Sequence, residues 1–280
     1  MPPSTDASRA AAAYAGSTMT ERMPRARVVL VHGLRTSATM WRRQLLALEA
    51  LDLDVVAVDL PGHGSRLGDA FTLDEAFRVI DAALGPPDPS ETPLPSLLVG
   101  LSLGGYLSIE YAARNPGRID GLVAASCGIR PRGAALGGYQ RLAALIGRLP
   151  DRGRALNDFM ARAFLPAAAV DDVIAGGVAL DVMAPVLELV GTLDPERALA
   201  KIEVPVWFVN GRFDHFRIEE RRMLRATRDA RLVVVPGATH LVSLARPDEF
   251  TAVVSGAVAE LEHRAALAAR HRRRIGAADA

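Results

Sequence analysis

Short runs of aliphatic residues alternate with longer segments of helical periodicity along most of this chain, and the alternation limits the folds open to it. The aliphatic runs occupy residues 27–31, 54–58, 96–99, 119–125, 204–209 and 232–235. The helical segments occupy residues 39–50, 72–84, 103–114, 218–227 and 247–266. Strands that alternate with helices pair in parallel, because each helix returns the chain to the end of the sheet at which the preceding strand began. The sequence therefore predicts an α/β fold with a mostly parallel, doubly wound sheet.

The alternation is interrupted once, over residues 129–198, where no strand pattern occurs. Alanine, leucine and arginine dominate this stretch, and glycine or proline divides it into short helical pieces. We therefore expect a helical cap inserted into the sheet domain. The predicted division of the chain is a disordered segment at 1–24, a core formed by 25–128 and 199–266, the cap at 129–198, and a basic tail at 267–280.

Composition narrows the function without naming it. The chain has 280 residues, half of them hydrophobic, and a formal net charge of +1. That charge predicts neither a nucleic-acid partner nor an anionic membrane, and no apolar run approaches the length of a membrane span. Cys127 is the single cysteine, so neither an internal disulfide nor a cysteine-built metal site is expected. We expect a cytoplasmic protein that needs no metal or cofactor, and a homodimer remains compatible with this interpretation.

A serine interrupts the apolar stretch at residues 97–107, where Gly100-Leu-Ser-Leu-Gly104 lies between a predicted strand and a predicted helix. The pattern Gly-x-Ser-x-Gly in that position is typical of a nucleophile elbow, a sharp turn that exposes the serine hydroxyl at the carboxyl end of the sheet. The alternative is an ordinary glycine-rich turn. The strand-turn-helix context favours Ser102 as a nucleophile.

A serine nucleophile needs a base, and the base needs a carboxylate that fixes its tautomer. His240 follows the last predicted strand, and Asp214 follows the strand before it. Both therefore lie at the carboxyl edge of the sheet, where sites of open α/β folds gather. The sequence predicts a catalytic triad of Ser102, His240 and Asp214. Backbone N–H groups of Leu34 and Leu103 are the candidates for an oxyanion hole.

These motifs together resemble the α/β-hydrolase family from about residue 25 to about residue 266. The resemblance rests on His32-Gly-Leu34, Asp59-Leu-Pro-Gly-His-Gly64, the serine motif, Asp214 and Pro236-Gly-Ala-Thr-His240. It implies that residues 129–198 cover the active site. The position after residue 125, which holds the acid in some members, is occupied by Ser126. The two antiparallel strands that usually precede the first parallel strand are not recognisable in residues 1–24.

The favoured function is hydrolysis of a carboxylic ester, thioester or lactone through an acyl-enzyme. A carbon–carbon bond hydrolase or a cofactor-free lyase of the same family is the alternative, and a non-catalytic binding module is a third. The substrate is expected to be a small molecule with an apolar acyl group, because aliphatic residues dominate the cap. The predicted substrate contacts are Arg35, Trp41, Phe159 and Met183, with Arg35 and Trp41 at the cavity entrance, although Trp41 suits the core equally well. Arginines in the first half of the cap suit either a solvated helix face or an anionic substrate.

Overall fold

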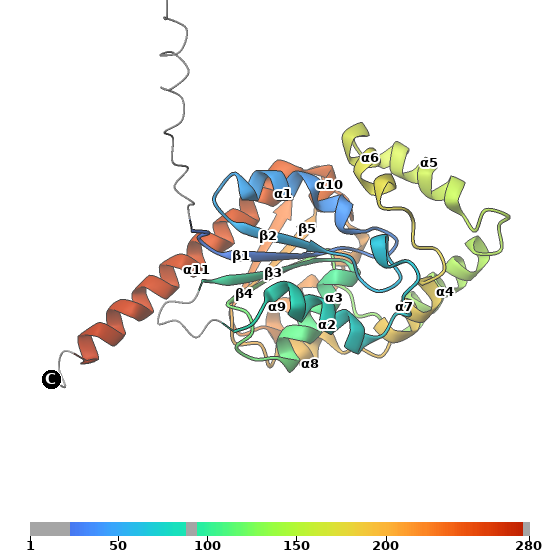
Figure 1. Ribbon diagram of the computed structural model, residues 1–280. Helices are drawn as coiled ribbons and strands as arrows, with labels where there is room; N and C mark the ends of the chain where they lie inside the picture. The colour runs from blue at the N-terminus through green and yellow to red at the C-terminus, as the bar shows by residue number, and fades with distance from the viewer. Residues whose placement is uncertain (1–22, 88–93, 277–280) are drawn as a thin grey trace, which may run out of the picture.

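A single parallel sheet forms the centre of the protein. The computed structural model describes residues 23–87 and 94–276. The strands are β1 (Arg27–Val31), β2 (Asp54–Val58), β3 (Ser96–Leu101), β4 (Gly121–Ala125), β5 (Val206–Gly211) and β6 (Ala230–Val235). They lie in the order β2-β1-β3-β4-β5-β6, and every neighbouring pair is parallel. The predicted fold class is therefore confirmed (Figure 1).

Helices cover both faces of this sheet. They are α1 (Arg42–Glu49), α2 (Leu73–Leu84), α3 (Leu103–Arg114), α9 (Glu220–Ala226), α10 (Val242–Ala245) and α11 (Pro247–Gly276). Side chains alternate along a strand, so Val29 and Val31 pack with α2 and α3 on one face, whereas Val28 and Leu30 pack with α1 and α11 on the other. Two hydrophobic cores result, which explains why the strand sequences are apolar throughout.

Only helices occupy the chain between β4 and β5. They are α4 (Gly133–Ile146), α5 (Arg154–Phe164), α6 (Ala167–Ala175), α7 (Met183–Val190) and α8 (Pro195–Leu199). Helices α4 to α7 gather at one end of the sheet (Figure 1), where α4 contacts α7 and α6 contacts the 3-10 helix η1 (Ala38–Trp41). Helix α8 instead packs on α3 and α9. Helix α8 therefore belongs to the helical layer that contains α3 and α9, and not to the group formed by α4 to α7.

Several element boundaries differ from the predicted ones. Strand β3 continues to Leu101, because Gly100 and Leu101 still pair with Ala124 and Ala125 of β4. Strand β5 is displaced toward the C-terminus for the same reason, since Gly211 pairs with Val235 of β6. The predicted helix at 39–50 begins as η1 and becomes α-helical at α1. Strand pairing across the sheet therefore decides where β3 and β5 end.

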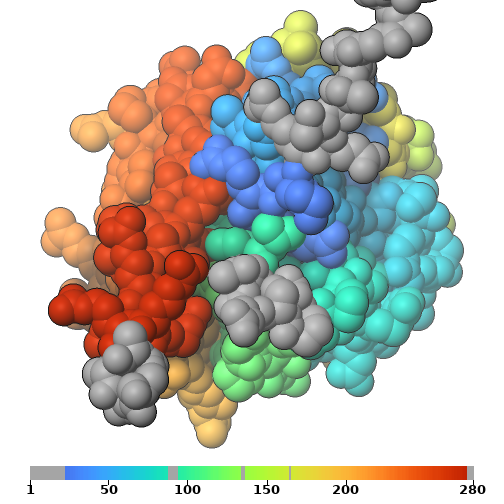
Figure 2. All heavy atoms as spheres, turned by 60° about the vertical axis from the view of Figure 1, so that its left-hand side comes forward, coloured from blue at the N-terminus to red at the C-terminus, as the bar shows by residue number. Residues whose placement is uncertain are grey.

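The C-terminal helix is longer than expected. We predicted an end near Ala266 followed by a separate basic tail, but α11 continues to Gly276. Residues 267–275 contain no glycine or proline, and arginines favour the C-terminal turn of a helix. Figure 2 shows α11 against the start of β1, where Arg25 and Glu262 form an ion pair at 2.6 Å. The expectations for residues 1–22 and 277–280 lie outside the described residues.

Candidate active site

Ser102 stands at the turn between β3 and α3, in a backbone conformation that few residues adopt. Its φ is +54°, in the left-handed region. The turn is held on its inner side by a hydrogen bond from the Ser102 N–H to the Ala125 carbonyl at 2.8 Å. The following residue, Leu103, begins α3. This strained, anchored turn is the geometry that the Gly-x-Ser-x-Gly pattern predicted.

The flanking glycines allow the turn to pack this closely. A Cβ at Gly100 would overlap the Gly104 carbonyl, and a Cβ at Gly104 would overlap the carbonyls of Val31 and His32. Glycine is therefore required at Gly100 by the turn itself and at Gly104 by the end of β1, which lies against it. The Gly104 N–H donates to the His32 carbonyl at 3.1 Å.

A chain of hydrogen bonds joins the three predicted triad residues. His240 Nε2 lies 2.9 Å from Ser102 Oγ, and His240 Nδ1 lies 3.0 Å from Asp214 Oδ1. Asp214 follows β5 and His240 follows β6, so neighbouring strand ends bring the three loops together. In the neutral tautomer that this geometry accommodates, Nδ1–H donates to the carboxylate and Nε2 accepts from the hydroxyl.

Asp214 is enclosed, and its surroundings favour the carboxylate. Its side chain has no exposed surface. Burial by itself raises the pKa of Asp214, but the hydrogen bond and charge of His240 and the Phe216 N–H, 2.8 Å from Oδ1, hold the pKa below its usual value. The group is therefore negative when the imidazole becomes charged, which stabilises the imidazolium.

His240 is held in place by Phe216 and Ser126, neither of which the sequence indicated for this role. The Phe216 ring packs beside the imidazole with 4.5 Å between centroids. Ser126, in the position after β4, donates from Oγ to the His240 carbonyl at 2.7 Å, and its own φ is +53°. Ser126 was considered only as a missing acid, and no local sequence signal reveals its contact with a loop 114 residues away.

The two predicted oxyanion donors lie beside Ser102, Leu34 in the loop after β1 and Leu103 at the start of α3. Leu34 and Leu103 both line the same cavity as Ser102. Within the described residues, no hydrogen-bond acceptor meets the Leu34 N–H, and the Leu103 N–H is one of the free amides at the start of α3. Both donors are therefore available to a ligand at Ser102.

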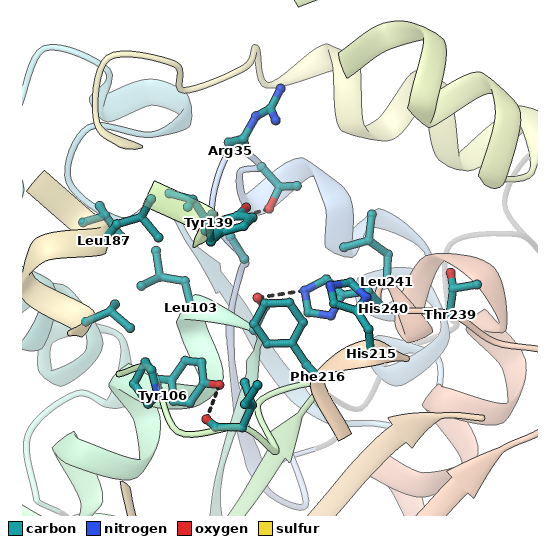
Figure 3. Close-up of a pocket in the computed structure, with 18 of the residues that line it drawn as sticks. Arg35, Leu103, Tyr106, Tyr139, Leu187, His215, Phe216, Thr239, His240 and Leu241 are labelled. Carbon is teal, nitrogen blue, oxygen red and sulfur yellow. Dashed lines mark hydrogen bonds between the residues drawn. The ribbon is translucent and has the colours of Figure 1, made fainter. Parts of the chain in front are cut away.

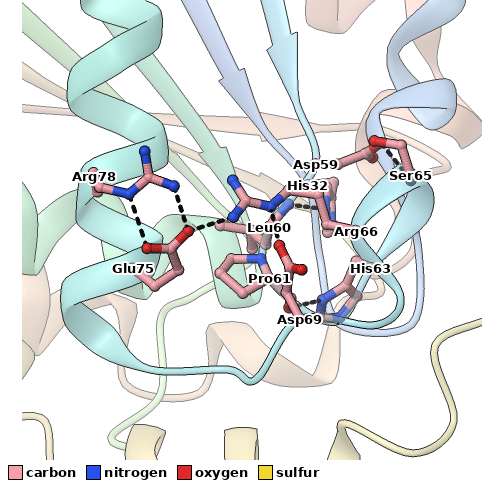
Figure 4. A network of polar contacts seen from close by, with 10 residues as sticks. All are labelled: His32, Asp59, Leu60, Pro61, His63, Ser65, Arg66, Asp69, Glu75 and Arg78. Carbon is pink, nitrogen blue, oxygen red and sulfur yellow. Dashed lines mark hydrogen bonds and ion pairs between the residues drawn. The ribbon is translucent and has the colours of Figure 1, made fainter.

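A second loop, residues 59–64, lies against the end of β1 at His32 (Figure 4). Asp59 accepts hydrogen bonds from the Ala38 N–H at 2.7 Å and from the N–H and Oγ of Ser65 at 2.8 Å. His32 Nε2 accepts from the Leu60 N–H at 3.0 Å. His63 is buried, with 4.9 Å between its ring centroid and that of His32. The motif from Asp59 to Gly64 thus holds both ends of the loop that contains Leu34, and it does not line the cavity of Ser102.

A cavity of about 660 Å³ opens above the Ser102–His240 pair (Figure 3). Its walls come from the loops after β1, β3, β4, β5 and β6 and from α4 to α7. Aliphatic and aromatic side chains dominate the wall, among them Leu136, Tyr139, Met160, Leu165, Val173, Val186, Leu187, Val190, Phe213 and Phe216. The size and apolar lining suit a small molecule that carries an acyl chain.

Of the four predicted substrate contacts, only Arg35 lines this cavity. Trp41 has no exposed surface and packs on Phe250 in the core beneath α1. Phe159 is 66% exposed on the outer face of α5, and Met183 is buried at the start of α7. These three assignments are corrected. The helical phase of α5 and α7, which the sequence left ambiguous, turns other residues of those helices inward.

No cluster of metal-ligating side chains occurs among the residues that the structure covers. In the same residues, no helix has the length and apolar character needed to cross a membrane. Cys127 is free and buried beneath α3.

A family model described as "Alpha/beta hydrolase family" matches residues 28–253. The chain belongs to the α/β-hydrolase family. The match covers both parts of the sheet and the helices inserted between them, so the resemblance carried by the sequence motifs is confirmed.

Among curated proteins, the chain is similar to a pimeloyl-[acyl-carrier protein] methyl ester esterase of Cronobacter sakazakii. The two are 28% identical over 263 residues, which is 85% of this chain and 94% of that protein. Among solved structures, the fold of the present chain is similar to that of a thermophilic esterase from Thermogutta terrifontis. The TM-score is 0.69 at 22% identity, and the match covers 85% of this chain and 91% of the esterase. An enol-lactonase from Burkholderia xenovorans shares this fold with a TM-score of 0.67, 22% identity and coverage of 82% and 90%. The expected ester hydrolysis agrees with the activity named for the Cronobacter protein.

Proposed function

We propose that this α/β hydrolase cleaves a carboxylic ester through a covalent acyl-enzyme formed on Ser102. The single observation that carries the proposal is the continuous hydrogen-bonded chain from Ser102 Oγ through His240 to Asp214 at the floor of an apolar cavity. The relatives named as ester hydrolases support the same reaction class.

In the first step, His240 Nε2 takes the proton of Ser102 Oγ while the oxygen attacks the ester carbonyl carbon. The carbonyl π electrons move to oxygen, and the N–H groups of Leu34 and Leu103 donate to the resulting oxyanion. Collapse of this intermediate breaks the bond to the alcohol oxygen, which receives the proton from His240. Water then repeats the sequence on the acyl-enzyme and releases the acid.

The helices between β4 and β5 belong to the same proposal. We propose that α4 to α7 act as a cap on the core, because they supply a large part of the cavity wall. The cap predicted over residues 129–198 then ends before α8, which packs on α3 and α9 and belongs to the core. Thioesters and lactones fit the same mechanism, since each presents an electrophilic carbonyl with an acceptable leaving group.

The test combines a mechanism-based probe with a substrate series. A fluorophosphonate should label the wild type and fail to label Ser102→Ala. Across 4-nitrophenyl esters of two to eight acyl carbons, kcat/KM should rise by about fourfold per added methylene until the cavity is filled, from about 0.8 kcal/mol per buried methylene. Uniformly weak turnover of every ester beside rapid cleavage of a vinylogous diketone would instead assign the carbon–carbon hydrolase, and binding without turnover would assign a non-catalytic module.

A further inference from the structure

Two arginines, Arg35 and Arg130, line the cavity, and they differ in whether a carboxylate pairs with them. Arg130 forms an ion pair with Glu219 at 2.7 Å and lies 3.6 Å from Glu196. Arg35 makes no hydrogen bond and no ion pair within residues 23–87 and 94–276. Its Nε and Nη2 are nevertheless shielded from solvent. The Arg35 guanidinium is therefore a cation in the cavity wall without a partner from the described chain.

The surroundings of Arg35 make this position costly for a charge. Burial lowers the pKa of Arg35, and the nearby Tyr139 phenol and Asp158 carboxylate only partly oppose that shift. Asp158 forms no ion pair with it. Removing an arginine from water without an anion destabilises the folded state, so side chains in such positions are usually paired. A paired arrangement would form if the bound molecule supplied the anion.

The position of Arg35 in the site specifies where that anion would lie. Arg35 directly follows Leu34 in the proposed oxyanion loop, with a φ of +68°. Figure 3 shows its guanidinium on the side of the cavity that faces the cap helices, apart from the hydrogen bond made by His240. Tyr139 of α4 and Asn157 of α5 add polar groups to the same cavity, whose wall is otherwise mainly apolar.

We infer that Arg35 binds a carboxylate at the far end of the substrate, so that the natural substrate class is the half-esters of dicarboxylic acids. The apolar wall would hold the methylene chain between the carboxylate and the ester carbonyl at Ser102. A guanidinium suits this task because it donates two parallel hydrogen bonds to one carboxylate. The inference rests on the proposed function, since it assigns the substrate of that same site.

The experiment compares esters that differ only in charge. The probes are 4-nitrophenyl monoesters of adipic, pimelic and suberic acids and their neutral counterparts, in which a primary amide replaces the free carboxylate. The wild type should prefer the carboxylate of each pair. Arg35→Met should lower that preference by about 10- to 100-fold, the range expected for a charge-assisted pair. Most of the change should come from kcat/KM of the anionic ester, and Arg35→Lys should retain part of the preference.

Arg162→Met is the matched control, because Arg162 is an exposed arginine of α5 outside the cavity. It should leave the preference unchanged, which separates contact from the overall charge of the cap. An unchanged preference in a folded Arg35→Met would overturn the inference. If Arg35→Met does not fold, Arg35→Gln replaces it, and failure of both to fold would assign Arg35 a structural role instead.

Equilibrium binding separates this inference from the proposed function. If the wild type hydrolyses no ester at all, the proposed function fails, and calorimetric titration with adipate and its neutral diamide decides about Arg35. Binding of adipate that is lost in Arg35→Met would support the anion site, whereas equal or absent binding of both probes would refute it. Arg35→Met should also melt at a higher temperature than the wild type without ligand, because it removes an unpaired charge.

Discussion

Protonation of one buried histidine should make the fold sensitive to mild acid. His32 follows β1 and has no exposed surface. The Leu60 N–H donates to its Nε2, so the ring proton must be on Nδ1, which lies 2.8 Å from the Gly33 carbonyl. A second proton would go to Nε2, where the new N–H would face the Leu60 N–H and replace its hydrogen bond by a repulsion. Burial, and then the neighbouring His63, lower the pKa of His32 from 6.5 to about 3.

The direction and size of the effect follow from proton linkage. Below pH 6.5 the unfolded chain binds a proton at this histidine, but the folded chain does not until about pH 3. The free energy of unfolding therefore falls as the pH falls through this window, by up to about 1.4 kcal/mol per pH unit. Between pH 7 and pH 4.5, His32 alone should remove roughly 2–3 kcal/mol, a large share of a typical stability of about 5–15 kcal/mol.

The assay is urea unfolding of the wild type and His32→Gln at intervals from pH 7 to pH 4.5. The glutamine oxygen can accept from the Leu60 N–H but does not titrate. His32→Gln should be less stable at pH 7, yet should lose roughly 2–3 kcal/mol less than the wild type across the series. His263→Gln, on the exposed side of α11, is the control for removing a histidine and should follow the wild type. Parallel stability curves for the wild type and His32→Gln would refute the reasoning.

Three further outcomes follow from the site. Gly104→Ala should destabilise the protein by about 3 kcal/mol or more in urea unfolding, because its methyl group would overlap the Val31 carbonyl. Gly256→Ala, in open space on α11, should instead stabilise it by about 0.5–1 kcal/mol, and equal effects would contradict the steric argument. Asp214→Asn should lower kcat for a 4-nitrophenyl ester by about three to four orders of magnitude with little change in melting temperature, and near-normal kcat would remove Asp214 from the triad. Cys127 should resist iodoacetamide until urea unfolds the chain, because burial raises the pKa of its thiol; rapid labelling of the folded protein would contradict this.

The sequence alone was sufficient for the succession of strands and helices along the chain and for the nucleophile motif. Strand and helix periodicities are local properties, and the Gly-x-Ser-x-Gly turn has a fixed relation to the strand before it and the helix after it. The proximity of Ser102, Asp214 and His240 could also be predicted, because parallel strands end at one edge of the sheet. The Ser126 contact with the His240 loop could not, since it joins two loops whose separation is set only when β4, β5 and β6 pair.

The cavity wall was decided by tertiary packing. Phe159 and Met160 are neighbours on α5, yet only Met160 faces the cavity, and the amphipathic pattern did not reveal which face of α5 turns inward. The sequence left Trp41 open between the cavity entrance and the core, and the packing of α1 against α11 buries it beside Phe250. The isolation of Arg35 likewise depends on which acidic groups come within reach in three dimensions. Local sequence determines the conformation of each segment, but the neighbours of a side chain are determined by how whole elements pack, which no short stretch of sequence encodes.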